Sequence, residues 1–286
     1  MVTWRGSAGA SLGGDVHVDV LDGGALRLDG GAMFRVVPRA LWERALPPDD
    51  RNRVRLAMRP TLVRAGGAVV LVDSGIGAAR RDARFAERVA LEPGPGLPAE
   101  LGRLGLAPAD VTHVVLTHLH FDHAGGLATA EAPAAPAFPN ARVVVQRGEL
   151  EDAAADCPLC RASYVAADLD AVRDRLLVIE GDPELVPGVR LVRTGGHTRA
   201  HQVVRVEGPD GEAVVWGDLV PTASHLRPHW VMGFDLFPVD AYAQKRRLLP
   251  EAAARGAVSV LYHEPGPALG TLAADGDAWR LEPPPA

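Results

Sequence analysis

Short apolar runs alternate with longer amphipathic segments along most of the chain. Eight runs have the length and β-branched content of strands, at residues 16–20, 68–72, 112–116, 142–146, 189–193, 201–206, 212–216 and 257–262. Segments of helical character lie between them, at residues 76–91, 97–105, 147–156, 166–176 and 240–256. Interleaved strands and helices predict an α/β protein in which helices cover a sheet.

The strand patterns continue along the chain without an obvious linker. Stretches rich in proline and glycine at 92–98 and 129–140 interrupt them only briefly, as loops do. A chain of 286 residues is long for an average domain but within the range of one large α/β domain. We therefore predict one domain over residues 1–286, with N-terminal strands and a lid-like loop in 1–63 and a loose tail at 270–286.

Composition and charge narrow the classes of function. Hydrophobic residues make up 47% of the chain, which suits a packed core. The formal net charge is -6 and there is no long basic run, so nucleic acid is not an expected partner. No stretch approaches the roughly 20 apolar residues of a membrane span, and the first residues lack the apolar core of a signal peptide. These features predict a soluble, cytoplasmic protein that has no membrane partner.

The segment THLHFDHAGG, residues 117–126, directly follows one of the apolar runs. His118 and His120 alternate along the chain, so an extended backbone can aim both imidazoles at one point, while Asp122 and His123 follow in a tight turn. Imidazole nitrogens and carboxylate oxygens are the ligands of zinc and similar borderline ions. The glycines that follow let the turn enter a helix without Cβ clashes. Four ligand-type side chains within six positions predict a metal site.

This segment resembles the signature of the metallo-β-lactamase superfamily, and further motifs match that family in order. The segments LVDSGIG, TGGHT, WGDLV and LYHEP supply, respectively, Asp73, His197, Asp218 and His263. The resemblance covers roughly residues 30 to 265. It implies an αββα sandwich of two mixed β-sheets flanked by helices, with the site at the mouth between the sheets.

By position, the resemblance implies two metal sites and a bridge. The ligands would be His118, His120 and His197 for the first ion, Asp122, His123 and His263 for the second, and Asp218 between them. Asp73 would orient a ligand histidine. Zinc is expected first, with iron, cobalt or manganese as alternatives. Two divalent ions about 3.5–4 Å apart can activate a shared water. We therefore predict a binuclear hydrolase that uses a metal-bridging hydroxide, with Asp122 and Asp218 as catalytic residues.

Single positions distinguish this chain from some branches of the superfamily. His120 stands where flavodiiron oxygen reductases have glutamate, and Asp218 stands where class B1 lactamases have cysteine. The acidic net charge of the chain disfavours the nucleic-acid-processing nucleases of the superfamily, which carry basic binding surfaces. The segment HLHFDHAGG is similar to N-acyl homoserine lactonases, but Pro221 replaces the tyrosine with which they contact the substrate. Residues 221–238 are closer in character to the methyl parathion hydrolase-like group.

The resemblance therefore predicts hydrolysis of a small-molecule lactone or ester, with promiscuous phosphotriesterase activity on organophosphates. Two alternatives stay open: a mononuclear iron persulfide dioxygenase, and a glyoxalase II-like thioesterase, although few residues follow His263 where the latter enzymes add a helical region. Members of the family are often dimers, so a homodimer is compatible with the resemblance.

Large apolar and imidazole side chains near the motifs are candidates for substrate contact, although core packing is the simpler explanation for most of them. They are Met33, Phe34, Trp42, Phe121, His225, His229, Trp230, Met232 and Phe234. We interpret His17, His113 and His201 as structural.

Cys157 and Cys160 form one CxxC pair without two further zinc ligands nearby. We interpret them as plain thiols, with a disulfide or an intersubunit metal clip as alternatives.

Overall fold

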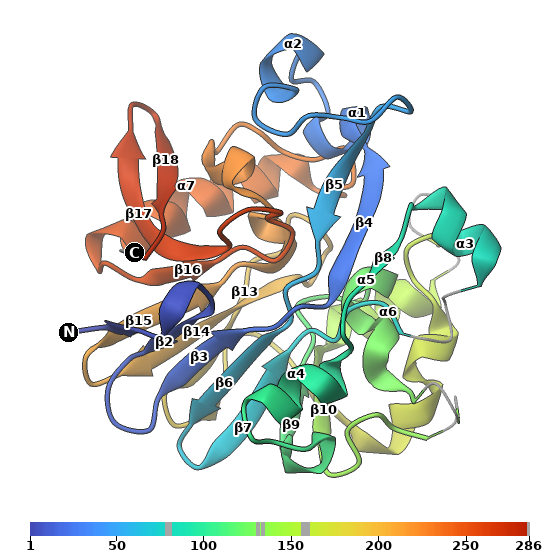
Figure 1. Cartoon of the computed structure of the whole chain (residues 1–286), viewed down its shortest axis with the longest axis vertical. Helices are drawn as coiled ribbons and strands as arrows, with labels where there is room; N and C mark the ends of the chain where they lie inside the picture. Colours follow the sequence, from blue (N-terminus) through green and yellow to red (C-terminus); the bar gives the residue numbers. More distant parts are fainter. Residues whose placement is uncertain (78–81, 130–131, 133–134, 156–160, 285–286) are drawn as a thin grey trace.

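The computed structural model describes residues 1–77, 82–129, 132, 135–155 and 161–284. Two β-sheets pack face to face, and helices cover the outer face of each sheet (Figure 1). The αββα sandwich implied by the sequence is therefore confirmed. Cys157 and Cys160 lie outside the described residues, so their predicted role stays a prediction.

The first sheet has eight strands and combines antiparallel N-terminal strands with a parallel half. The parallel pairs need crossover connections, and helices supply them. In order across the sheet the strands are β1 (Thr3–Trp4), β2 (Gly9–Ser11), β3 (His17–Val20), β6 (Thr61–Ala65), β7 (Ala68–Val72), β9 (His113–Val115), β10 (Arg142–Gln146) and β11 (Leu176–Ile179).

The second sheet has seven strands, which are antiparallel except for the parallel pair of β15 and β16. In order across the sheet they are β12 (Glu184–Val186), β13 (Val189–Arg193), β14 (Gln202–Gly208), β15 (Gly211–Val215), β16 (Val258–Val260), β17 (Leu269–Asp275) and β18 (Ala278–Glu282).

Alternation along the central strands divides their side chains between the layers. On β7, Val70 and Val72 point into the interface between the sheets, whereas Leu71 packs under the helices on the outer face. On β15, Val215 points into the same interface and Val214 packs on the opposite outer face. Strands buried on both faces explain why these runs are continuously apolar in the sequence.

Helices α4 (Leu97–Arg103), α5 (Phe121–Ala124) and α6 (Arg147–Ala154) lie over the first sheet, and α7 (Pro238–Ala254) lies over the second. The predicted helix at 76–91 is shorter: α3 covers only Ala83–Arg88, and residues 78–81 are not described. The segment predicted as a helix at 166–176 forms 3-10 turns, η5 (Ala166–Arg175). The other 3-10 turns are η1 (Gly6–Ala8), η3 (Pro108–Asp110), η4 (Gly125–Leu127), η6 (Gly217–Leu219) and η7 (Ala223–Leu226).

Residues 1–63 contain the predicted N-terminal strands, but the prediction of a lid-like loop is wrong where the segment forms helices and further strands. It contains helices α1 (Gly30–Phe34) and α2 (Arg39–Trp42) and a small third sheet, whose strands are β5 (Arg53–Ala57), β4 (Gly24–Asp29) and β8 (Glu92–Pro93). Figure 1 shows α1 and α2 at one end of the long β4–β5 ribbon. The apolar side chains of this unit form their own core cluster, and this burial orders the segment.

The loose tail predicted at 270–286 is also wrong over most of its length. Strands β17 and β18 form an antiparallel hairpin at the edge of the second sheet (Figure 1). Leu272 is buried, and Trp279 and Leu281 pack against the same cluster under α7. Gly276 turns the hairpin with a φ of 61°.

The helices in the described part of the chain are all too short or too polar to span a membrane.

Candidate metal centre

The candidate ligands lie where strands end at the mouth of the sandwich. His118, His120, Asp122 and His123 follow β9 and continue into α5. The others come from the second sheet: His197 follows β13, Asp218 lies in η6 after β15, and His263 follows β16. All seven side chains are buried. The fold thus gathers residues that are far apart in the sequence.

Three histidines form the first group, in which the potential ligand atoms of His118, His120 and His197 all lie within 4.8 Å of one another. Nδ1 of His120 is 3.1 Å from Nε2 of His197. Nε2 of His118 is buried without a hydrogen-bond partner. This group matches the first metal site implied by the resemblance.

The second group contains Asp122, His123 and His263. Nε2 of His123 is 3.3 Å from Nε2 of His263, which in turn is 3.6 Å from Oδ2 of Asp122. Asp218 stands between the groups. Its Oδ1 is 3.3 Å from both His123 and His263, and its Oδ2 is 3.3 Å from Nε2 of His197.

These separations suit metal ions. Ligand atoms about 2.0–2.1 Å from a tetrahedral ion lie about 3.3–3.4 Å from one another, which is close to the distances around Asp218. A buried polar atom without a hydrogen-bond partner is costly unless something else binds it. Nε2 of His118 and Oδ1 of Asp218 are such atoms. The residues present therefore fit two cations that share the Asp218 carboxylate.

Burial and the local charges act differently on the candidate ligands. Burial lowers the pKa of His118 and His120 well below the usual range, which keeps these imidazoles neutral, as metal binding requires. Burial opposes charge on His123 and on Asp218 as well. The surrounding carboxylates nevertheless raise the pKa of His123 well above its usual range, and the surrounding histidines hold the pKa of Asp218 well below its own.

Asp73 orients the segment 117–126, which carries four of the candidate ligands. Its carboxylate accepts hydrogen bonds from the backbone and hydroxyl of Thr117, each at 2.8 Å, and lies 2.8 Å from Nδ1 of His123. This bond leaves Nε2 of His123 directed at His263. Asp73 adopts a φ of 59°, which is uncommon outside glycine and occurs at sites where the surroundings hold a residue in place.

Other buried groups fix the remaining ligands. Nδ1 of His263 is 2.8 Å from Ala57 O, so a backbone carbonyl holds this ring. His201, which we interpreted as structural, accepts a hydrogen bond from Asp218 N at 3.1 Å. The hydroxyl of Tyr262 donates to Asp122 O at 2.7 Å, and its ring stacks on His123.

Glu149 connects the two segments that carry the three-histidine group. The buried carboxylate accepts hydrogen bonds from Leu119 N, Ala200 N and the hydroxyls of Tyr164 and Thr198. Burial raises its pKa, and these four donors counteract that rise. The carboxylate therefore holds the His118–His120 turn against the segment that follows His197.

Replacing Glu149 by glutamine should lower the free energy of unfolding by about 2–4 kcal/mol, because an amide nitrogen cannot accept and leaves buried donors without partners. Urea denaturation of the zinc-loaded protein measures the difference. Glu151→Gln, an exposed change on the same helix, is the control and should change stability by less than about 0.5 kcal/mol. Equal stability of the two variants would show that the four bonds do not hold the turn.

Most of the predicted substrate contacts are core residues. Met33, Phe34 and Trp42 are buried, as are His225, Trp230 and Met232. Phe34 stacks between Trp42 and His225. Both ring nitrogens of His225 are engaged, by the Thr222 hydroxyl and by Met33 O. Packing in the α1–α2 unit engages these side chains, and their contact with a substrate stays a prediction.

The three other predicted contacts are more exposed. His229 is on the surface and lines a groove with Tyr242 and Trp279, so its predicted role is not supported. Phe121 and Phe234 are half-buried and pack at the rim of the α1–α2 core cluster. These two residues are more accessible than the six buried ones.

Sequence reasoning missed three buried residues that support the centre: Glu149, Asp235 and Tyr262. Local signals for two of them were present. Asp235 lies inside the segment 221–238, and Tyr262 directly precedes a ligand. Glu149 has no such signal, because its partners are distant in the sequence.

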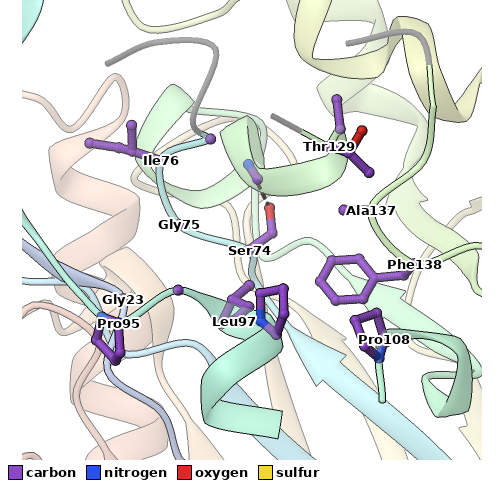
Figure 2. Close-up of a pocket in the computed structure, with 15 residues that line it drawn as sticks. Gly23, Ser74, Gly75, Ile76, Pro95, Leu97, Pro108, Thr129, Ala137 and Phe138 are labelled. Carbon is purple, nitrogen blue, oxygen red and sulfur yellow. Dashed lines mark hydrogen bonds between the residues drawn. The ribbon is translucent and has the colours of Figure 1, made fainter. Parts of the chain in front are cut away.

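A cavity of about 470 Å³ lies beside the centre, next to the segment that follows β7 (Figure 2). Ser74 lines it, together with Leu97 of α4 and Phe138. The hydroxyl of Ser74 donates to His123 O and accepts from Gly126 N, the bond drawn in Figure 2. The seven candidate ligands are absent from the described lining, so this cavity is distinct from the space between the ligand groups.

Comparison with known proteins gives named relatives. N-acyl homoserine lactonase AiiA of Bacillus thuringiensis subsp. kurstaki is 38% identical over 117 residues, which is 40% of this chain and 40% of the lactonase. N-acyl homoserine lactonase AttM of Azorhizobium caulinodans is 32% identical over 185 residues, 59% of this chain and 64% of that protein. The matched region thus spans less than two thirds of either relative.

Solved structures share the architecture over nearly the whole chain. A probable metal-dependent hydrolase from Staphylococcus aureus has a TM-score of 0.84 and 29% identity, covering 94% of this chain and 98% of its own. The dizinc quorum-quenching lactonase AidC has a TM-score of 0.78 and 20% identity, covering 96% of both chains, which shows a common fold. The family model described as the Metallo-beta-lactamase superfamily matches residues 60–263, from the start of β6 to the last candidate ligand. The sandwich, the clustered histidines and this match establish that the chain belongs to the metallo-beta-lactamase superfamily.

Proposed function

We propose that the protein is a binuclear metal-dependent hydrolase that opens lactones or cleaves related esters. The observation that carries this proposal is Asp218, whose two carboxylate oxygens face the two ligand groups separately. The similarity to N-acyl homoserine lactonases supports a lactone as the substrate. We propose His118, His120 and His197 for one ion and Asp122, His123 and His263 for the other.

The bound ions would supply Lewis-acid chemistry, lowering the pKa of a shared water and polarising the carbonyl of the substrate. The protein provides the remaining functions. Asp122 is close enough to the centre for its carboxylate to orient the attacking water or accept its proton. Asp218 holds the two ligand groups at a fixed separation. Addition of water to the lactone carbonyl and cleavage of the ring C–O bond then give a hydroxy acid.

Phosphotriesters are a second, promiscuous substrate class in this proposal. Their hydrolysis also needs a nucleophile on one side of the centre. On the other side, it needs stabilisation of the negative charge that develops in the transition state. Zinc is the metal that we propose first, because imidazole and carboxylate ligands with this spacing suit it.

Elemental analysis of the purified protein, combined with a substrate panel, tests the proposal. The panel contains an N-acyl homoserine lactone, an aryl ester, a thioester and paraoxon. We expect two divalent ions per chain and lactone hydrolysis that chelation abolishes and zinc restores. One iron per chain with oxygen uptake on a persulfide would instead identify a dioxygenase. Fully metallated protein that hydrolyses none of the panel would reject the proposed function.

We further propose that Phe121 contacts the apolar part of the substrate. It lies between two candidate ligands in the sequence, is half-buried, and packs edge-on against Phe85 with the ring centroids 5.5 Å apart. Phe121→Ala should raise KM for a long-chain acyl lactone by about tenfold, since losing this contact removes about 1–2 kcal/mol of binding. The value of kcat should change little. A short-chain lactone is the control, because its KM should stay within about twofold. An equal loss with both lactones would contradict the contact.

A further inference from the structure

His197 has a buried partner that the proposed mechanism does not use. Its Nδ1 lies 2.9 Å from Oδ1 of Asp235, and both side chains are almost fully buried. Its other nitrogen, Nε2, is 3.1 Å from Nδ1 of His120. The ring therefore presents one nitrogen to Asp235 and the opposite one to the three-histidine group.

Asp235 also fixes the segment to which it belongs. Its second oxygen, Oδ2, accepts a hydrogen bond from Met232 N at 2.8 Å. The next residue, Leu236, donates its backbone N–H to His197 O at 2.9 Å. Backbone and side chain thus join the same two stretches of chain. The same segment carries Phe234, which lies half-buried at the rim of the α1–α2 core cluster.

Lys245 of α7 holds the start of the segment that carries Asp235. Lys245 is 1% exposed, on the face of α7 that otherwise buries apolar residues such as Ala241 and Leu249. Its Nζ donates to Trp230 O at 2.7 Å, at the start of the segment that ends in Asp235. Burial lowers the pKa of Lys245 to about 8, and the Asp235 carboxylate counteracts that fall. A buried ammonium is costly, and its position here is explained by a nearby opposite charge and a carbonyl.

We propose that Asp235 is a positioning residue of the metal centre, and that Lys245 holds the segment that carries it. Asp235 selects the tautomer of His197 that has its proton on Nδ1, which leaves Nε2 free to bind a cation. Carboxylates behind ligand histidines commonly act in this way. This inference rests on the proposed function, because it takes His197 as a ligand. It predicts that a substitution in the segment 230–236 also changes metal binding at the three-histidine site.

Zinc titration of metal-free protein against a chromophoric chelator tests the proposal. In wild type we expect two binding steps. Asp235→Ala and Asp235→Asn should weaken one step by about 10- to 100-fold and leave the other unchanged. Asparagine has the shape of aspartate but only one acceptor oxygen, so either His197 or Met232 N loses its partner. Asp240→Asn, the same change at an exposed position of α7, is the matched control and should bind as wild type does.

Two further measurements cover variants of Asp235 that fail to fold. Lys245→Met keeps the length of the side chain without its charge, and it should weaken the same step by a smaller factor. Nitrogen-15 spectra of the zinc-loaded wild type should place the His197 proton on Nδ1. A proton on Nε2, or wild-type affinity for both steps in Asp235→Ala, would overturn the inference while leaving the hydrolase proposal intact. Wild-type protein that binds none of zinc, iron, cobalt and manganese would instead reject the proposed function itself.

Discussion

Replacing Asp218 by alanine should lower kcat for lactone hydrolysis at least about a thousandfold, a loss of about 4 kcal/mol of transition-state stabilisation. The carboxylate lies 3.3 Å from histidines of both ligand groups. Without it, the mutual repulsion of two bound cations is no longer offset at this position. We therefore also expect fewer than two zinc ions per chain after dialysis.

Steady-state kinetics and elemental analysis of the same preparation measure the two effects. Asp275→Ala, at an exposed position at the end of β17, is the control and should retain wild-type values. Circular dichroism establishes that the Asp218 variant is folded. A folded variant that binds two zinc ions and retains a tenth of the wild-type kcat would contradict a bridging role for Asp218.

Replacing Phe34 by alanine should lower the free energy of unfolding by about 3–5 kcal/mol, the usual cost of removing a buried aromatic ring. The ring is fully buried and stacks on Trp42 and His225, with centroids 5.1 and 5.0 Å away. An edge contact with Trp230 links it to the segment that carries Asp235. The cavity left by alanine cannot close without moving these neighbours.

Urea denaturation measures this loss. Phe237→Ala is the matched control, since Phe237 is 39% exposed and should cost less than about 1 kcal/mol. At low temperature, where the variant is folded, KM for the lactone should stay close to the wild-type value. A large rise in KM with little loss of stability would instead show that Phe34 contacts the substrate, as its position in the sequence suggested.

The lid and tail predictions fail for one reason, which is that both segments bury apolar side chains in regular structure. Met33, Phe34 and Trp42 are large apolar residues near the motifs, and we predicted that they contact the substrate. The segment instead forms two short helices and pairs β4 with β5, so that these side chains face each other. The tail prediction is wrong for a related reason, because the Asp-Gly-Asp sequence at 275–277 turns a hairpin.

The sequence by itself determined which side chains gather at the candidate centre and which strands carry them. Four of the candidate ligands lie within six positions of one motif, and the resemblance to the metallo-β-lactamase superfamily supplied the other three, each in a short segment that follows an apolar strand. Continuous apolar runs likewise predicted most of the central strands, because burial on both faces leaves such runs, whereas the division into two sheets came from the resemblance.

Only the tertiary structure decided how the ligands are held. Asp235 meets His197 across 38 positions of sequence, and Glu149 meets Thr198 across 49. Such contacts depend on how α6 and α7 pack on the sheets, and packing is not recorded in the local pattern of either partner. The orientation of each imidazole, and therefore which nitrogen faces the centre, follows from those distant contacts.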